Sequence, residues 1–257
     1  MPVIQTVLFD LGGTLLHYEQ PPELSFDAIN ARALHALLEA AAAAGVRVRD
    51  HDIAVRAVGR MAAAAEAKAK RARYASTAEV IIREGLEAVG VSLPAPAFQA
   101  GIEAYYRTVS SIVRPVDGDP ANVLARLSAQ GRSMGVVSNT SWAPALHDSD
   151  LERFGLLQYL PVRIYSYAFG LTKPHQAIYR EALNKLDVAP LEAVFVGDRL
   201  AVDIAGARKV GMRTVLVRSP YHAEEDPEIT PDETVDTIAE LPELLAAWEL
   251  ALNPEVR

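Results

Sequence analysis

Short runs of apolar residues recur along the chain and predict β-strands. They span residues 3–9, 134–139, 161–166, 193–198 and 213–217. Between and after the later runs, apolar residues recur at every third or fourth position, which predicts helices over residues 120–130, 148–154, 175–186, 203–210 and 241–252. Strands that alternate with helices over short connections are typical of a doubly wound parallel sheet. The sequence therefore predicts an α/β fold of this class.

Residues 23–113 have a different pattern, with helical periodicity throughout and no predicted strand. The predicted helices of this segment start at Ser25, at Asp50 or Asp52, at a capping box formed by Ser76-Thr77-Ala78-Glu79, and near Pro94 and Pro96. We therefore predict two domains, an α/β core of residues 1–17 and 114–257 and a helical domain of residues 18–113 inserted after the first strand. Pro and Gly residues interrupt the helical pattern near residues 16–22 and 112–118, which predicts hinges there.

The composition narrows the function classes. The chain has 257 residues, no cysteine and a net charge of −8 at pH 7. The negative charge argues against nucleic acid or an anionic membrane as a partner, and the lack of cysteine excludes disulfides, thiolate catalysis and cysteine-ligated metals. No apolar stretch approaches the ~20 residues of a membrane span, and the first residues do not resemble a signal peptide. We expect a cytoplasmic protein, and the sequence does not predict its oligomeric state.

Polar residues stand at the ends of several predicted strands. Asp10 follows the first strand, Ser138 and Asn139 end the second, and Asp198 ends the strand at 193–198. Because the carboxyl ends of parallel strands meet at one edge of a sheet, where such folds bind ligands, these side chains should converge. The sequence therefore predicts a functional site at that edge.

Two further residues define the chemistry of this predicted site. Lys173 stands just before a predicted helix, and Asp203 follows Asp198 within a loop or a first helical turn. A group of carboxylates suits a hard divalent cation such as Mg²⁺, and a lysine suits the oxygens of a phosphoryl group. Asp10 is then available as a nucleophile that forms an aspartyl-phosphate.

These residues lie in ordered motifs that resemble those of the haloacid dehalogenase-like (HAD) hydrolase superfamily. The motifs are Phe9-Asp10-Leu11-Gly12-Gly13-Thr14, Val136-Val137-Ser138-Asn139, Lys173-Pro174, and Val196-Gly197-Asp198 followed by Asp203. The resemblance covers the whole predicted core and implies a Rossmann-like sheet with a helical cap inserted after the first motif. It also implies a Mg²⁺-dependent phosphatase that acts on a small phosphorylated metabolite.

The resemblance implies a metal site with several ligands from this chain. Asp10 would be both the nucleophile and a ligand, and the backbone carbonyl of Gly12 would be a second ligand. Asp198 would bind the metal directly, and Asp203 directly or through water. All of these residues fall in the motifs at the predicted sheet edge.

The resemblance also implies a phosphoryl-binding set. Ser138, Asn139 and Lys173 would bind the phosphoryl group, with Asn139 orienting the site and Lys173 also serving catalysis. All of them fall in the second and third motifs.

Gly12 departs from the pattern of the phosphatases in this superfamily, which usually have a second Asp at that position. That Asp protonates the leaving group and then activates water, and such a group contributes roughly 10²–10⁴-fold. One interpretation is a phosphatase that tolerates the loss, through a good leaving group or through a proton from His17 or Glu19, which lie close in sequence.

Three other interpretations stay open. A 2-haloacid dehalogenase lacks the second Asp and needs no metal, but has Ser and Asn where this chain has Gly197 and Asp198. A phosphonoacetaldehyde hydrolase has a Schiff-base lysine in its cap, whereas the first lysine here is Lys68, in a basic run at a helix end. A binding module with weak or no catalysis would explain the loss of the acid, but not the retention of the other charged residues.

Overall fold

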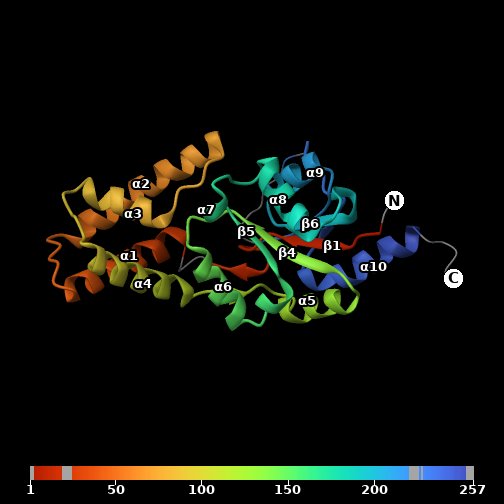
Figure 1. The fold of residues 1–257 in the computed structure, drawn as a ribbon, viewed down its shortest axis with the longest axis horizontal. Helices are drawn as coiled ribbons and strands as arrows, with labels where there is room; N and C mark the ends of the chain where they lie inside the picture. The colour runs from red at the N-terminus through yellow and green to blue at the C-terminus, as the bar shows by residue number, and fades with distance from the viewer. Residues whose placement is uncertain (1–2, 19–24, 220–225, 227, 253–257) are drawn as a thin grey trace.

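The chain is elongated, with a helical part at one end and an α/β part at the other (Figure 1). The computed structural model describes residues 3–18, 25–219, 226 and 228–252. The α/β part contains a parallel sheet with the strand order β5-β4-β1-β6-β7-β8. Its strands are β1 (Thr6–Phe9), β4 (Ser133–Ser138), β5 (Val162–Tyr165), β6 (Ala193–Gly197), β7 (Arg213–Val217) and β8 (Glu233–Val235). The predicted fold class is confirmed, and β8 is a strand that the apolar pattern did not predict.

Helices cover both faces of the sheet, because the strands alternate their side chains between two hydrophobic cores. Leu8 and Phe195 pack with helix α8 (Gln176–Leu186) and helix α9 (Ala205–Val210) on one face. Val7 and Val194 pack on the other face, with helices α5 (Pro120–Ala129) and α10 (Leu241–Leu252). A sheet that is buried on both faces needs near-continuous apolar strands, which is the pattern seen in the sequence.

Two predicted helices of the α/β part differ from the structure. Helix α6 spans Pro144–Arg153 and therefore starts before the predicted residue 148, because Pro144 is tolerated in its first turn. The segment predicted as a helix from residue 203 instead begins with a π-helical turn, Leu200–Ile204, and α9 follows it. A short helix, α7 (Ser166–Phe169), was not predicted.

The helical part consists of α1 (Phe26–Ala43), α2 (His51–Ala72), α3 (Ala78–Glu87) and α4 (Ala95–Ser110). Helix α1 packs along α4 and helix α2 along α3. Ser25 and Asp50 cap α1 and α2 as predicted. The capping box at the start of α3 was wrong: Thr77 caps the helix, and Glu79 instead accepts a hydrogen bond from the hydroxyl of Tyr106 at 2.6 Å. Glu79 is therefore used to join two helices.

Two connections join the helical part to the sheet. Strands β2 (Leu16–His17) and β3 (Arg114–Pro115) form a short antiparallel ladder beside the predicted hinges. Glu19, Pro21 and Pro22 lie outside the described residues. The division into a core and a cap at residues 18–113 stays a prediction, and below we use "cap" for helices α1–α4.

The connection between α2 and α3 lies against the α/β part. Its main chain forms hydrogen bonds from Thr172 N to Arg73 O at 2.9 Å, from Ala75 N to Gly170 O at 3.0 Å and from Ala78 N to Ser141 O at 2.6 Å. The cap is therefore docked on the loop that precedes Lys173.

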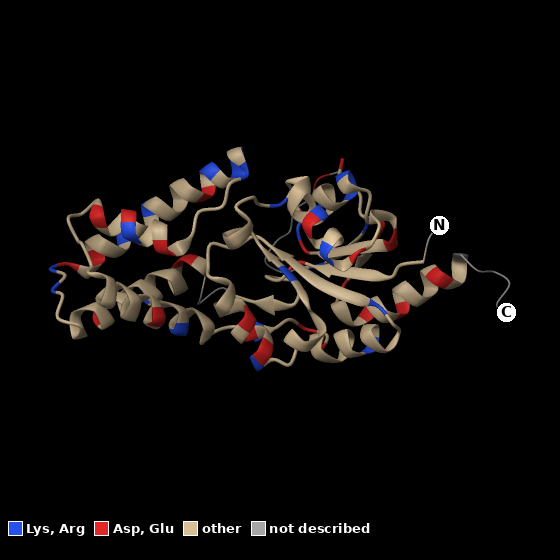
Figure 2. Cartoon of the chain, viewed as in Figure 1, with Lys and Arg blue, Asp and Glu red and all other residues tan. Residues whose placement is uncertain are grey.

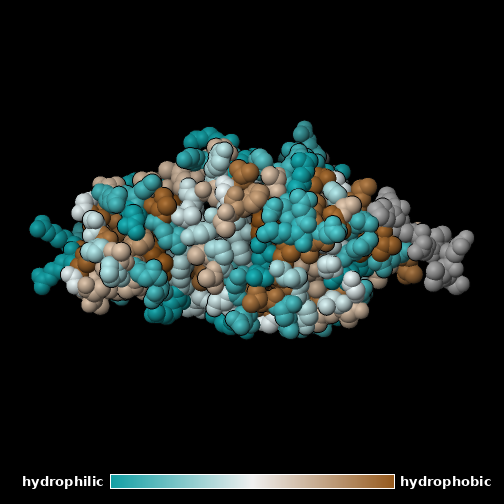
Figure 3. Space-filling view, in the orientation of Figure 1, coloured by the Kyte–Doolittle hydropathy of each residue, from teal (hydrophilic) through white to brown (hydrophobic). Residues whose placement is uncertain are grey.

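Basic and hydrophobic residues are distributed differently over the surface. Basic residues gather at the C-terminal end of α2, where Lys68, Lys70 and Arg71 are exposed (Figure 2). On the face seen in Figure 3, hydrophobic residues form separate spots among hydrophilic ones. No helix among the described residues has the length and apolar character needed to cross a membrane.

Candidate active site

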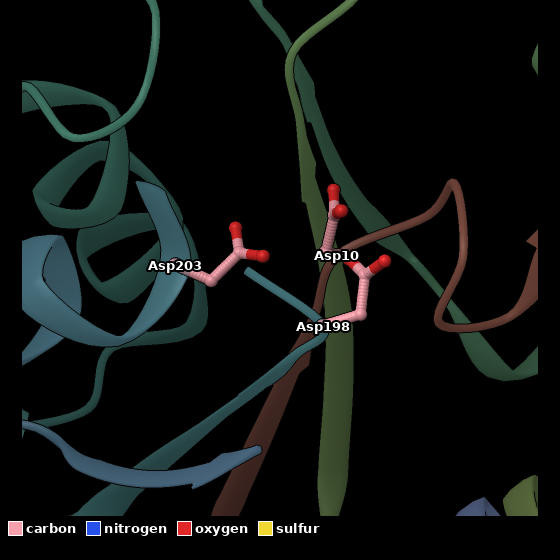
Figure 4. A group of neighbouring side chains, drawn as sticks. All are labelled: Asp10, Asp198 and Asp203. Carbon is pink, nitrogen blue, oxygen red and sulfur yellow. The ribbon is translucent and has the colours of Figure 1, made fainter. Parts of the chain in front are cut away.

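Asp10 lies at the centre of the sheet edge, as the strand ends predict. It follows β1, and its backbone N–H donates to Val196 O at 2.8 Å, which continues the ladder between β1 and β6. Asp198 follows β6, so the register of these neighbouring strands brings the two carboxylates close together. One oxygen each of Asp10, Asp198 and Asp203 lies within 4.8 Å of the others, and all three residues are buried. Figure 4 shows Asp203 facing Asp10 and Asp198 from the opposite side.

Two glycines make this approach of carboxylates possible. Gly13 has a φ of 84°, and a Cβ at this position would overlap the carboxylate of Asp198. A Cβ on Gly197 would stand 2.6 Å from the Cγ of Asp203. Asp203 is held in turn by a hydrogen bond from Arg199 N to its Oδ2 at 3.1 Å, within the π-helical turn. Gly13 and Gly197 are therefore required by contacts inside the site.

Lys173 places its ammonium group between two of the carboxylates. Its Nζ lies 2.6 Å from Asp10 Oδ1 and 2.7 Å from Asp203 Oδ1, and the residue is only 2% exposed. The side chain of Asn139 accepts a hydrogen bond from Lys173 N at 2.7 Å and donates one to Lys173 O at 3.1 Å. Asn139 therefore fixes the main chain of Lys173.

The cluster holds more negative than positive charge in a buried space. Burial and the neighbouring Asp10 raise the pKa of Asp198 to about 8. Burial also raises the pKa of Asp203 to about 6, against the opposing effect of Lys173. For Lys173, burial alone would lower the pKa, but the charges of Asp10 and Asp203 outweigh it and raise the pKa above its ordinary value. A divalent cation would relieve the repulsion among these carboxylates.

The cluster opens into a cavity of about 880 Å³ between the cap and the sheet edge. Asp10, Gly12, Ser138 and Lys173 line it from the α/β part. The predicted phosphoryl-binding residue Ser138 is 4% exposed and ends β4, next to β1. Of the predicted site residues, Asp10, Gly12, Ser138, Asn139 and Lys173 line this cavity, and Asp198 and Asp203 lie buried beside Asp10.

A buried polar chain beside the cavity was not predicted. The hydroxyl of Tyr18 lies 2.8 Å from His147 Nδ1, and Thr140 Oγ1 lies 2.8 Å from His147 Nε2. Burial lowers the pKa of His147 to about 4 and raises the pKa of Tyr18 well above its ordinary value, so both are neutral at pH 7. No sequence signal connects these residues, because they come from separate elements and meet only in the fold.

His17, one of the two residues considered as substitute proton donors, lines the same cavity from β2. Burial and the charge of Arg114 lower its pKa to about 4, so its imidazole is neutral at pH 7. Glu19, the other, lies outside the described residues.

A comparison of the sequence with profiles of protein families gives a result consistent with this site and this sheet. A profile of haloacid dehalogenase-like hydrolases matches residues 4–211 of the chain. The chain belongs to the haloacid dehalogenase-like hydrolases. The resemblance seen in the motifs is thereby confirmed, and the match covers both the HAD core motifs and the inserted helices.

Known HAD proteins similar to this chain include phosphatases and dehalogenases. A glyceraldehyde 3-phosphate phosphatase from Pyrococcus furiosus is 36% identical over 151 residues, which are 58% of this chain and 61% of that protein. The alignment therefore spans less than two thirds of that relative. A 2-haloacid dehalogenase structure from Pseudomonas syringae pv. Tomato DC3000 is 25% identical, with a TM-score of 0.67 over 96% of this chain and 100% of that one.

A third similar protein shares the fold with lower identity. The HAD phosphatase structure from Thermococcus onnurineus has a TM-score of 0.62 and 23% identity, over 94% of this chain and 97% of that one. Because phosphatases and dehalogenases share this fold, the choice between their chemistries depends on the residues of the site.

Proposed function

We propose that this HAD protein is a phosphatase that hydrolyses phosphoric monoesters through an aspartyl-phosphate on Asp10. The observation that supports this most directly is the buried group of Asp10, Asp198 and Asp203 with Lys173 between two of its members. A carboxylate nucleophile, a cation for phosphoryl oxygens and ligands for a divalent metal are what phosphoryl transfer requires. The sequence similarity to a phosphatase supports the same conclusion.

In the proposed reaction, a carboxylate oxygen of Asp10 attacks phosphorus and the P–O bond to the alcohol breaks. Water then hydrolyses the aspartyl-phosphate, which releases phosphate and restores Asp10. Lys173 holds Asp10 Oδ1 in place at 2.6 Å and offsets the charge of the phosphoryl oxygens, with Ser138 as a further contact. Asn139 acts as a positioning residue, since its amide is bonded to the main chain of Lys173.

The residues present fit Mg²⁺, since the three buried carboxylates repel one another and lie close enough to share one ion. Asp10, Asp198, Asp203 and the backbone carbonyl of Gly12 would hold it. When bound, the metal supplies charge stabilisation to the phosphoryl group in the transition state. A small phosphorylated molecule is the proposed partner, and the cytoplasmic location stays a prediction.

The cluster argues against the dehalogenase interpretation. A 2-haloacid substrate brings its own carboxylate, and Asp198 and Asp203 would repel it within the same buried space. The retained cluster also argues against a binding module, because buried like charges are costly where no chemistry or ligand needs them. Gly12 nevertheless leaves the leaving group without the usual acid, which favours esters of acidic alcohols.

The test is phosphate release from p-nitrophenyl phosphate and acetyl phosphate, with Mg²⁺ and with EDTA. We expect release that needs Mg²⁺ and falls by at least about 10³-fold in Asp10→Asn, because the amide is not a nucleophile. Thermal unfolding and circular dichroism of the variant check that its fold is retained. Halide release from 2-haloacids in EDTA is measured in parallel.

Two outcomes would contradict the proposal. Full phosphatase activity in Asp10→Asn would exclude Asp10 as the nucleophile. Halide release without metal, together with no phosphate release, would assign the protein to the dehalogenases.

A further inference from the structure

The wall of the cavity opposite the carboxylates is formed by the cap and is mostly apolar. Helix α2 presents one face to the cavity, with Val55, Val58, Ala62 and Ala69 at helical spacing. Leu34 of α1, together with Ile81 and Ile82 of α3, extends this wall. The moiety that leaves the phosphoryl group during hydrolysis would therefore contact alkyl side chains.

Several polar groups at this wall, from the cap and from Trp142 of the α/β part, are bonded to one another. Trp142 Nε1 donates to the hydroxyl of Tyr105 at 3.1 Å, and that hydroxyl donates to Asn30 Oδ1. Asn30 Nδ2 donates to Phe26 O at 2.7 Å, and the ring of Phe26 stacks on Trp142 with 5.4 Å between centroids. Because these groups have partners within the protein, they do not require a polyhydroxylated substrate to satisfy them.

In the part of the chain that the structure describes, the positive charges of the cavity lie on the side of the α/β part and not on the side of the cap. Among the described residues that line the cavity, the lysine and arginine residues are Lys173 and Arg199, and both come from the α/β part. Lys173 is paired with Asp10 and Asp203, and the charge of Arg199 acts on Asp198. The cap contributes the acidic Glu66 and Asp27 to the lining, and the stretch 19–24 contains no Lys, Arg or His.

From this apolar wall and the position of the charged residues we propose that the substrate is a phosphate monoester whose alcohol moiety is uncharged and largely apolar, as in aryl phosphates. The inference rests on the proposed phosphatase function and adds the substrate class. A second anionic group on the alcohol would lie against an apolar and acidic wall without a partner, which is unfavourable. The cavity of about 880 Å³ also matches the size that holds drug-sized ligands, larger than a three-carbon alcohol needs.

The test compares esters that differ in charge but little in chemical reactivity. Phenyl phosphate and 3-carboxyphenyl phosphate release phenols of similar acidity, and only the second adds a negative charge. We expect kcat/KM for phenyl phosphate to exceed that for the carboxylated ester by about tenfold or more. We also expect 1-naphthyl phosphate to be at least as good a substrate as phenyl phosphate.

A pair of variants tests whether the cap wall causes this preference. Ala62 is exposed and lines the cavity, whereas Ala64 is exposed on the same helix and does not line it. Ala62→Arg should reduce the preference against the carboxylated ester several-fold, since it supplies the missing cation. Ala64→Arg adds the same charge to the protein and should leave the preference unchanged.

The outcomes separate this inference from the proposed function. Equal activity on the two esters, or a preference for the carboxylated one, overturns the inference. So does hydrolysis of acetyl phosphate that depends on Asp10 without hydrolysis of any aryl ester, although Asp10 then stands as the nucleophile of a phosphatase. If acetyl phosphate is not hydrolysed either, the proposed function fails and the inference fails with it. An equal change in both arginine variants would exclude the cap wall as the cause.

Discussion

Gly12 stands where the sequence predicts the loss of a general acid. Its φ is not in the left-handed region, and a Cβ at this position would meet Tyr18 Cδ2 at 3.7 Å, an ordinary contact. The backbone therefore accepts a side chain, and Gly12→Asp should restore a general acid. We expect it to raise the hydrolysis of alkyl phosphates by about tenfold or more, and that of p-nitrophenyl phosphate much less, because nitrophenolate leaves without a proton.

Gly12→Asn is the matched control, because it has the same shape and cannot supply the proton. Steady-state kinetics of both variants on both esters would separate a chemical effect from a steric one. Equal acceleration by Asn and Asp, or no acceleration by Asp, would show that the lack of an acid at position 12 does not limit the proposed reaction.

Asp198 tests the metal site through stability rather than activity. Without a cation, burial and the charge of Asp10 disfavour the ionised form of Asp198. Asp198→Asn should therefore increase the free energy of unfolding in EDTA at pH 8. Mg²⁺ at 100 times its Kd should stabilise the wild type by about 2.7 kcal/mol and the variant by much less.

Urea unfolding with Mg²⁺ and with EDTA measures both effects. Asp117→Asn is the control, since its side chain is 91% exposed and the variant makes the same change in charge. Equal stabilisation of wild type and Asp198→Asn by Mg²⁺ would remove Asp198 from the ligand set.

At the scale of elements, close packing inside the cap depends on glycines. A Cβ on Gly85 of α3 would stand 2.6 Å from the Cα of Val58 in α2, so the backbones of these helices touch. Gly85→Ala should force them apart and lower the free energy of unfolding by about 1–3 kcal/mol. The same change at Gly59, where a Cβ meets nothing within 4 Å, should raise it by up to about 1 kcal/mol through helix propensity.

Chemical denaturation of the two variants measures this difference. Both variants replace a helical glycine by alanine, and they differ only in the atoms that the new methyl group contacts. A loss of stability in Gly59→Ala as large as in Gly85→Ala would mean that contact between α2 and α3 is not the cause.

The elements that the sequence predicted well are those with a strong local signal. The strands β1, β4 and β6 are apolar runs that end in polar residues, and parallel-strand geometry then places those residues together. Strand β8 (Glu233–Val235) was missed because two of its three residues are exposed and it has no apolar run. The start of α3 was misassigned because Ser76 and Thr77 both fit an N-cap, and the partner of Glu79 lies on another helix.

In the candidate site, too, the features with a local sequence signal could be predicted and the others could not. Asp10, Asp198 and Asp203 could be predicted as neighbours because their strand ends and motifs are local in sequence. The use of Asn139 to hold Lys173, and the chain from Tyr18 through His147 to Thr140, could not be predicted. Those contacts depend on side-chain directions that only the packed structure determines.

At the scale of the whole molecule, cap and sheet enclose one cavity because the α2–α3 connection is hydrogen-bonded to the loop before Lys173. Ala75 and Ser76 of this connection line the cavity. Arg73, in the same connection, accepts a hydrogen bond from Thr172 N through its carbonyl oxygen. In this arrangement the apolar side chains of the cap line the same cavity as Asp10, whose carboxylate cluster is buried.

His147 is buried in the folded molecule, which makes the stability of the molecule depend on pH. Its pKa falls from 6.5 to about 4 in the folded state, so the unfolded chain binds the proton first as the pH drops. Its contribution to stability is complete above about pH 6.5 and decreases toward pH 4, reaching a loss of about 2 kcal/mol at pH 5. His147→Gln should be less stable than wild type at pH 7 but lose less stability on going to pH 5.

Urea unfolding across this range measures the difference, with His35→Gln as the control because its side chain is 41% exposed. Parallel pH profiles for wild type and His147→Gln would mean that His147 does not titrate between the two states.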